Sequence, residues 1–369
     1  MKKVLLPKII QIEVTTACQL RCVFCPHTVM AKEWLKTHMP WETFSSLLPF
    51  VRHAKLVHLQ GWGEPLLHPR LWDMAVAIRE RHGRVSLTTN ALLLDESVAR
   101  EACRIGLDLV AVSVAGARAE TNDSLRVGSH LERICANISY LCRLKPRPKV
   151  HLVMQMMRPN IEELPELVTL ASRLGVDEVI VPNLDYTPTE EADALRIFNR
   201  SADHNYTALT EEATRRGKEL GIKVHIYPLS PRDDVLMCDA YPVDNVWISV
   251  SGEVAPCPYL ALSLRGQLPR LFWGKKEDLP RFSFGNVTAG LDRILKGQTA
   301  RSFREAFSRR LLADRMGIIA TVKGSSMLGI SGSSVDFFES LAQIASREGS
   351  SALPPAPDIC HNCYKLYGL

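Results

Sequence analysis

A regular alternation of short apolar runs with helical patterns constrains the fold of this chain more than any other feature of its sequence. Over the first 225 residues, runs of β-branched and apolar residues recur six times, each followed by a stretch of helical periodicity. This alternation is typical of βαβ units around a parallel sheet. The predicted strands are Ile9–Val14, Leu56–Gln60, Val85–Thr89, Leu109–Val114, Val150–Met156 and Glu178–Val181.

Six such units are fewer than the eight of a closed barrel, so we predict an α/β fold with a partial (β/α)6 TIM-like barrel. Its helices include Trp41–Val51, Leu71–Arg81, Leu131–Leu144 and Leu164–Leu174, with C-terminal stops at Gly83, Gly106 and Gly175. In this architecture functional residues lie where strands end, at the carboxyl face of the sheet.

The pattern changes after about residue 226. The run Val246-Trp-Ile-Ser-Val, the pair Ser251-Gly252 and then Glu253-Val-Ala predict a β-hairpin with a two-residue loop. We therefore expect a barrel over residues 1–225 and a small, hairpin-containing C-terminal domain over residues 226–369. Gly-, Ser- and Pro-rich segments at 324–334 and 349–357 flank an amphipathic stretch, 335–346, which suggests an insertion at about 312–357.

Charge and hydropathy indicate a soluble, cytoplasmic protein. The net charge of +5 comes from 45 basic and 40 acidic side chains without a polybasic tail, so nucleic-acid modification rests only on a mild basic excess. No run of about 18 apolar residues occurs, and no cleavage-type segment follows MKKVLL, so we expect no membrane association. One basic cluster is predicted to be a solvated helix face, or alternatively a docking site for an acidic partner: Arg293, Lys296, Arg301, Arg304, Arg309 and Arg310.

Ten cysteines in a reducing compartment indicate chemistry rather than disulfides. Cys18-x3-Cys22-x2-Cys25 directly follows the first predicted strand, on a loop that can wrap one object so that three thiolates converge. Three ligands without a nearby fourth imply an open coordination site. A structural zinc site is the alternative, with His27 as the only close fourth ligand.

This CxxxCxxC, with the aromatic Phe24 before its last cysteine, resembles the signature of the radical S-adenosylmethionine (SAM) superfamily. The resemblance covers about residues 9–225. It implies a [4Fe-4S] cluster on Cys18, Cys22 and Cys25 whose unligated iron chelates the amine and carboxylate of SAM. One electron from the cluster then cleaves SAM to methionine and a 5′-deoxyadenosyl radical.

Later strand ends carry residues suited to a bound cofactor. In Gln60-Gly61-Trp62-Gly63-Glu64-Pro65 the glycines allow close backbone approach, and Glu64 can accept from an ammonium group, although an ordinary Gly-rich turn is the alternative. The segment resembles the family's Gly-Gly-Glu motif, which holds the SAM amino group. Thr88 and Asn90 end the third predicted strand and are placed to catch polar groups of the cofactor.

Three further residues complete the expected SAM site. Ser113 is the candidate for the ribose hydroxyls, where relatives often carry an Asp at the position of Ala115. Arg126 resembles the arginine that faces the SAM carboxylate, with a surface salt bridge as the alternative. Val181 would contribute an apolar wall for adenine, which core packing would explain equally well.

A second set of cysteines lies in the C-terminal part. Cys238, Gly252-x4-Cys257 and the terminal Cys360-x2-Cys363 resemble the SPASM or shorter twitch extensions of radical SAM enzymes, which carry auxiliary clusters. These four thiolates suit one fully ligated auxiliary [4Fe-4S] cluster, with a zinc ribbon as the alternative. The other cysteines fall in helical patterns and are expected to be core residues: Cys103, Cys135 and Cys142.

A fully ligated auxiliary cluster favours electron transfer, and hence a net oxidation of the substrate. The expected function is a radical SAM oxidoreductase that modifies a peptide or protein side chain, as a maturase. Oxidation of a small alcohol, as in aminoglycoside dehydrogenases of this family, is the alternative; a nucleic-acid-modifying enzyme and a non-catalytic iron-sulfur or zinc protein are the others. Asp185 and Tyr186 are the candidate bases.

The expected partners are a low-potential electron donor of the flavodoxin or ferredoxin type and the substrate itself, a peptide, protein or small molecule. The first predicted strand begins within ten residues of Met1, so a separate protein would have to recognise any leader peptide.

Overall fold

The computed structural model describes residues 6–199, 206–233, 235–324 and 353–369. A single ten-stranded sheet organises the chain, in the order β14-β11-β10-β1-β3-β4-β5-β7-β8-β9. All six predicted strands are confirmed as its central, parallel part. They are β1 (Ile9–Ile12), β3 (Leu56–Leu59), β4 (Val85–Thr89), β5 (Leu109–Val114), β7 (Lys149–Met154) and β8 (Glu178–Val181).

Two further parallel strands extend this barrel. β9 (Lys223–Ile226), which was not predicted, pairs with β8. β10 (Asn245–Ile248) is the predicted first strand of the C-terminal hairpin, but it also pairs in parallel with β1 at the opposite edge. The sheet therefore continues across the expected domain boundary at residue 225. β10 turns into β11 (Glu253–Ala255), which pairs with β14 (Gly285–Asn286).

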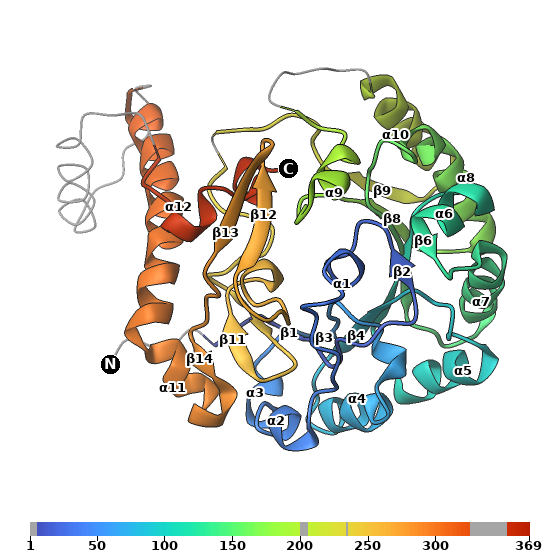
Figure 1. Ribbon diagram of the computed structural model, residues 1–369, viewed down its shortest axis with the longest axis horizontal. Coiled ribbons are helices and arrows are strands. Elements are labelled where there is room, and N and C mark those ends of the chain that lie inside the picture. Colours follow the sequence, from blue (N-terminus) through green and yellow to red (C-terminus); the bar gives the residue numbers. More distant parts are fainter. Residues whose placement is uncertain (1–5, 200–205, 234, 325–352) are drawn as a thin grey trace.

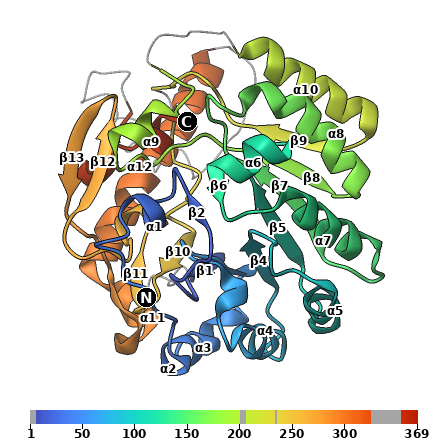
Figure 2. The same cartoon turned by 45° about the vertical axis from the view of Figure 1, so that its right-hand side comes forward.

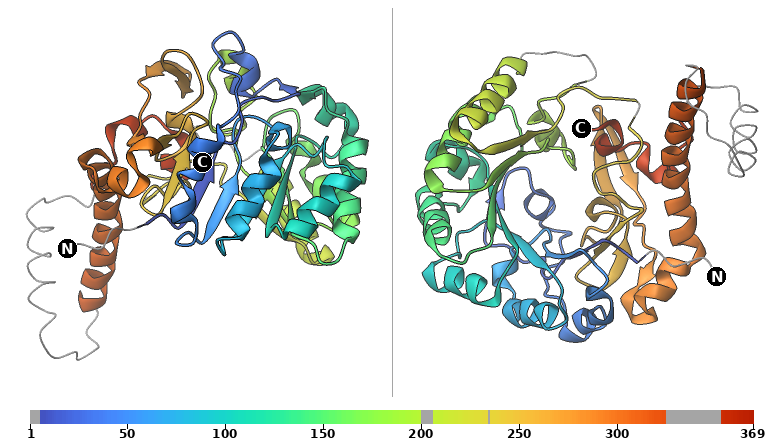
Figure 3. Two further views of the ribbon diagram at one scale, coloured as in Figure 1. Left: turned by 90° about the horizontal axis from the view of Figure 1, so that it is seen from below. Right: turned by 180° about the vertical axis from the view of Figure 1, so that it is seen from behind.

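Helices cover the convex, outer face of the curved sheet, as Figure 1 and the right-hand view of Figure 3 show. They are α2 (Trp41–Ser45), α3 (Leu48–Val51), α4 (Leu71–Arg79), α5 (Glu96–Ile105), α7 (Leu131–Arg143), α8 (Leu164–Leu174) and α10 (Thr207–Leu220). The predicted helix Trp41–Val51 is thus two short helices. Cys103, Cys135 and Cys142 on this layer are half-buried and pack against the core, as expected.

Two of the three predicted glycine stops are correct. Gly106 and Gly175 follow α5 and α8 in the left-handed conformation, with φ of 78° and 77°. Gly83 does not cap α4, because His82 takes the left-handed φ of 57° instead. Gly83 is required for packing: a Cβ there would lie 2.3 Å from Cγ1 of Val51.

The first C-terminal hairpin differs from prediction in its loop. Ser249 N–H donates to the Glu253 carbonyl over 2.9 Å, so the loop contains three residues, 250–252, rather than two. Gly252 has φ of +85°, the left-handed position of a three-residue loop with a bulge. A second hairpin, β12 (Leu268–Phe272) and β13 (Lys275–Leu279), stands beside the barrel mouth (Figure 1).

The basic cluster near residue 300 is not a simple solvated face. It lies on α11 (Leu291–Lys296) and α12 (Gln298–Gly324), and two of its arginines are buried. Arg304 donates to the Pro242 carbonyl, and Arg310 to the carbonyls of Val235, Leu236 and Pro354, so both hold the chain around Cys238 in place.

The expected amphipathic stretch at 335–346 lies outside the described residues. Among the helices that are described, none has the length and apolar character needed to cross a bilayer.

Candidate functional site

A cavity of about 490 Å³ opens among the carboxyl ends of the parallel strands. Loops that follow β1, β3, β4, β5 and β8 line it, as does the loop with β2 (Arg21–Cys22) and α1 (Pro26–Val29), which lies within the curve of the sheet (Figure 2). Nearly all the residues expected at the SAM site contribute to its wall: Cys18, Cys22, Phe24, Cys25, Gly61, Gly63, Glu64, Thr88, Asn90, Ser113 and Arg126.

The three N-terminal cysteines converge on this cavity. β2 pairs with β6 (Arg126–Val127), so that Cys22 lies opposite Arg126. Burial raises the pKa of Cys18 to about 11, and the Glu64 carboxylate and the neighbouring Cys22 add to the effect. Burial, then Cys22 and Cys18, also raise the pKa of Cys25. Thiols this buried and crowded favour a bound cation that stabilises their thiolates.

The Gly61–Glu64 segment is fitted tightly against the cysteine loop. Glu64 N–H donates to the Ala17 carbonyl over 2.8 Å. A Cβ on Gly63 would lie 2.5 Å from the carbonyl oxygens of Ala17 and Thr15, so glycine is required there for close approach. The Glu64 carboxylate, 2 % exposed, accepts from the backbone N–H of Asn90 over 2.7 Å. Burial raises the pKa of Glu64, and the hydrogen bond from Asn90 opposes the rise.

Arg126 is a buried arginine that forms no salt bridge in the described part of the chain. The residue is 7 % exposed and lines the cavity. Its Nε has no hydrogen-bond partner, and no ion pair among the described residues involves it. The surface salt bridge considered as an alternative is therefore not formed. A buried guanidinium of this kind favours an anionic ligand in the cavity.

Val181 is the one expected cofactor residue that the cavity wall lacks. It is fully buried in the core, whereas its neighbours Ile180 and Pro182 line the cavity. Successive side chains of a strand face opposite sides, so the apolar wall that was expected from Val181 comes from the adjacent positions. We therefore propose that Ile180 and Pro182, rather than Val181, form the apolar wall for adenine.

The C-terminal cysteines also converge. Burial raises the pKa of Cys360, and the neighbouring Cys257, Cys363 and Cys238 raise it further. Burial raises the pKa of Cys257 to about 12, with Cys363 adding to it. No three His, Cys, Asp or Glu side chains of the described chain meet at one metal-ion position. In a [4Fe-4S] cluster each thiolate binds a different iron, so its ligands stand wider apart than those of a single ion.

Comparisons with known proteins agree with this arrangement. Residues 12–171 match the radical SAM superfamily, and residues 238–314 match SPASM, an iron-sulfur cluster-binding domain. The chain belongs to the radical SAM superfamily and has a C-terminal SPASM domain. The enzyme therefore uses a [4Fe-4S] cluster with SAM, together with auxiliary iron-sulfur chemistry.

Curated relatives span most of this radical SAM enzyme. The chain is 26% identical to a tungsten-containing aldehyde ferredoxin oxidoreductase cofactor-modifying protein of Pyrococcus furiosus, over 76% of this chain and 78% of that one. It is 24% identical to an AdoMet-dependent heme synthase of Methanosarcina barkeri, over 73% and 83%. It is 28% identical to a PqqA peptide cyclase of Gluconobacter oxydans, over 66% and 68%.

Among solved structures, SuiB of Streptococcus suis bound to S-adenosylmethionine has the same fold. The TM-score is 0.62 at 16% identity, over 81% of this chain and 68% of that one. A partial barrel with a C-terminal auxiliary segment is therefore the architecture of this radical SAM enzyme too.

The residues present fit the cofactors of such an enzyme. Three thiols, an unpaired buried Arg126 and the Glu64 carboxylate face one cavity, which matches the iron, the carboxylate and the ammonium group of bound SAM. Four more thiols lie together beside the cavity wall. Which residues hold each group remains our proposal.

Sequence reasoning missed an aromatic wall between the two cysteine sets. Trp62, Tyr186 and Tyr259 pack together, with ring centroids 5.1 to 5.9 Å apart, and all three line the cavity. Cys257 and Cys363 pack against the same cluster. The wall therefore separates the cavity from the C-terminal cysteines by one layer of aromatic rings. Of these three residues, Tyr259 could have been suspected from the sequence, because it lies two residues after Cys257.

Asp185 and Tyr186, the candidate bases, both line the cavity but differ in their contacts. Asp185 accepts from the Tyr259 hydroxyl over 2.6 Å and pairs with the Lys365 ammonium over 2.7 Å. Tyr186 donates its hydroxyl to the Pro269 carbonyl over 2.8 Å. Burial raises the pKa of Tyr186 well above its ordinary value, so its hydroxyl stays protonated and is not available as a base.

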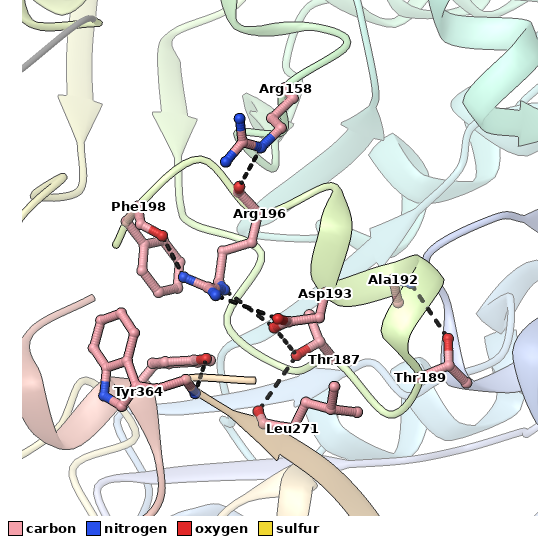
Figure 4. A network of polar contacts seen from close by, with 10 residues as sticks. Arg158, Thr187, Thr189, Ala192, Asp193, Arg196, Phe198, Leu271 and Tyr364 are labelled. Carbon is pink, nitrogen blue, oxygen red and sulfur yellow. Dashed lines mark hydrogen bonds and ion pairs between the residues drawn. The ribbon is translucent and has the colours of Figure 1, made fainter. Parts of the chain in front are cut away.

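A buried network fixes the loop that carries these two residues. Figure 4 shows Arg196 paired with Asp193, which in turn accepts from Thr187 over 2.9 Å. The Leu271 N–H of β12 donates to the Thr187 carbonyl over 2.8 Å. The loop after β8, which includes α9 (Glu190–Ala194), is thereby attached to the second hairpin.

Proposed function

We propose that this radical SAM enzyme oxidatively modifies a peptide or protein side chain, with Cys18, Cys22 and Cys25 holding the SAM cluster and Cys238, Cys257, Cys360 and Cys363 holding one auxiliary [4Fe-4S] cluster. The observation that carries the proposal is that one cysteine set lines the cavity, while Cys257 and Cys363 of the other set pack against the aromatic cluster that forms part of the same cavity's wall. When bound, the cofactors supply a 5′-deoxyadenosyl radical that abstracts a hydrogen atom and an acceptor for the electron of the substrate radical.

The chain's own residues would position and protect this chemistry. Glu64 and Arg126 orient the ammonium and carboxylate groups of the SAM methionine moiety through charge-assisted contacts. Thr88, Asn90 and Ser113 offer polar groups on the cavity floor, and Phe24 with Ile180 offers apolar surface. The aromatic wall excludes water from the space between SAM and the auxiliary site.

Asp185 is the better candidate for the proton acceptor that an oxidation requires. Its Oδ1 and the Tyr259 hydroxyl form a short hydrogen bond at the cavity wall, where a substrate group can approach both. Lys365 holds the second oxygen and fixes the orientation of the carboxylate. Tyr186 is less suited, because its hydroxyl is already donated to a backbone carbonyl.

The size of the cavity supports a side chain as the substrate. Pockets of about 300–1,000 Å³ hold one drug-sized ligand. At about 490 Å³, this cavity is in the range of one such ligand, so SAM would fill most of it and a substrate would enter with one group rather than as a whole molecule. The likeness to a PqqA peptide cyclase points the same way.

Modification of a cofactor or tetrapyrrole is the second candidate. It is favoured by the relatives that cover most of the chain, a cofactor-modifying protein and a heme synthase. Such a substrate would present one edge to the cavity and leave the rest outside. Oxidation of a small alcohol remains the other enzymatic alternative. The electron donor for the SAM cluster is proposed to be a flavodoxin or ferredoxin.

Metal analysis and substrate-dependent SAM cleavage test the proposal. After anaerobic reconstitution we expect about eight irons per chain, since each [4Fe-4S] cluster contains four, with 5′-deoxyadenosine formed under a low-potential reductant. About four irons with one zinc would remove the oxidative route. Linear peptides that stimulate 5′-deoxyadenosine formation above the uncoupled rate would support the peptide class, and stimulation by iron porphyrins alone would support the second candidate.

Asp185→Asn separates radical formation from product formation. The variant keeps the shape of the side chain and the hydrogen bond from Tyr259, so SAM cleavage should continue while oxidised product falls at least tenfold. Unchanged product yield would rule out Asp185 as the proton acceptor.

A further inference from the structure

Arg270 is a second buried arginine that lies beside a cysteine set. It stands on β12 with 2 % of its surface exposed. Its Nη1 donates over 3.0 Å to the carbonyl of Asn362, inside the Cys360-x2-Cys363 turn. Its Nε has no hydrogen-bond partner, and no carboxylate of the described residues forms an ion pair with it.

The surroundings of Arg270 offer other sources of negative charge. Its guanidinium lies over the Tyr186 ring, 5.5 Å from the centroid. A guanidinium stays charged inside a protein. Without a compensating negative charge, a buried cation is unfavourable.

Comparison with other buried or partly buried arginines shows what is particular to this position. Arg304 and Arg310 donate to backbone carbonyls away from the cavity, and Arg196 is balanced by Asp193. Arg126 and Arg270 instead have no carboxylate partner in the described chain, and each lies at one cysteine set. For Arg126 the expected anion is SAM. At Arg270 the thiolates themselves are the available anions.

We propose that Arg270 is the positioning residue that supplies the counter-charge of the auxiliary four-cysteine cluster and raises its reduction potential. The inference rests on the proposed function, because it assumes a cluster rather than zinc at Cys238, Cys257, Cys360 and Cys363. Reduction adds one negative charge, so a buried cation nearby stabilises the reduced form more than the oxidised form. A raised potential makes the cluster a better acceptor for the substrate's electron.

The test is a potentiometric titration followed by electron paramagnetic resonance on the reconstituted full-length enzyme. SAM perturbs only the cluster with an open iron, which identifies the auxiliary signal. Arg270→Gln removes the charge while its amide can still donate to the Asn362 carbonyl. Arg270→Lys keeps the charge. Arg196→Gln is the matched control, since it removes a partly buried cation that Asp193 balances in the same region.

We expect Arg270→Gln to shift the auxiliary potential to more negative values, with Arg270→Lys and Arg196→Gln close to wild type. Loss of auxiliary iron in Arg270→Gln alone would also support the charge role. An unchanged potential in Arg270→Gln, or the same defect in Arg270→Gln and Arg270→Lys, would overturn it. Iron and zinc content keeps the two proposals apart: zinc in the wild-type site defeats the proposed function, whereas eight irons with an unchanged potential defeats only this inference.

Discussion

Replacement of Arg126 by glutamine should weaken SAM binding without weakening the fold. Arg126 is 7 % exposed, and its Nε lacks a partner among the described residues. A hydrogen bond to a charged group contributes about 1.5–3 kcal/mol, which corresponds to a roughly 10- to 150-fold higher Kd for SAM. Because no ion pair is broken in the described chain, the free energy of unfolding of the SAM-free protein should change by less than about 1 kcal/mol.

Isothermal titration calorimetry of SAM on the anaerobically reconstituted variant measures the first quantity, and urea denaturation measures the second. Arg118→Gln is the control: Arg118 lies eight positions earlier, is exposed and pairs with Glu166 over 2.8 Å. It should bind SAM like wild type. Iron content must match wild type in both variants. A Kd within threefold of wild type, or a large loss of stability in Arg126→Gln, would refute the assignment of Arg126 to the SAM carboxylate.

Three further predictions concern the cysteine sites and their support. Cys22→Ala should abolish SAM cleavage, whereas Cys360→Ala should leave cleavage largely intact and block substrate turnover; equal loss of 5′-deoxyadenosine in both folded variants would contradict separate roles. Gly63→Ala should lower the iron bound at the first cluster several-fold, because its Cβ would lie 2.5 Å from backbone oxygens of the cysteine loop; iron analysis with unchanged loading would argue against that tight fit. Burial raises the pKa of Glu13 from 4.5 to about 7, so its proton stabilises the fold below pH 4.5, and about 3 kcal/mol of that stability is lost as pH rises through 7. Urea denaturation across this range should show the loss in wild type and not in Glu13→Gln.

The sequence was sufficient for the central sheet and for most of the cavity wall. Each of the six strands is a local apolar run, and local patterns set the existence of such elements. Cys18, Gly63 and Ser113 were placed correctly because parallel strands bring their carboxyl ends to one edge, so position in a βα unit fixes position in space.

The local sequence pattern does not show which side chains of a fully apolar strand face the cavity. Val179, Ile180 and Val181 are all apolar, so the run does not state which side chains face the barrel interior. Only the paired register shows that Ile180 lines the cavity. β9 was missed for a related reason: Lys223 and His225 are exposed at the sheet edge, which makes the strand too polar to stand out.

Contacts between distant segments were also beyond the sequence. Asp185 and Lys365 are 180 positions apart, yet they form a buried ion pair beside the cavity. Nothing in the sequence distinguishes Arg270 from the other arginines. The structure does, because the hairpin β12–β13 places it beside the Asn362 carbonyl. Such partners are set by tertiary packing, and no periodicity or spacing rule encodes them.

Glu13 explains why the two halves of the molecule act as one structure. At the end of β1 its carboxylate accepts from the Trp62 N–H, and also from the Val250 N–H and the Ser263 hydroxyl. Trp62 belongs to the expected SAM motif, while Val250 and Ser263 belong to the C-terminal part. β10 pairs with β1, the strand that Glu13 directly follows in the chain. The C-terminal segment therefore completes the barrel's first edge as well as carrying four cysteines, and Glu13 joins it to the loop that carries Trp62 of the aromatic wall.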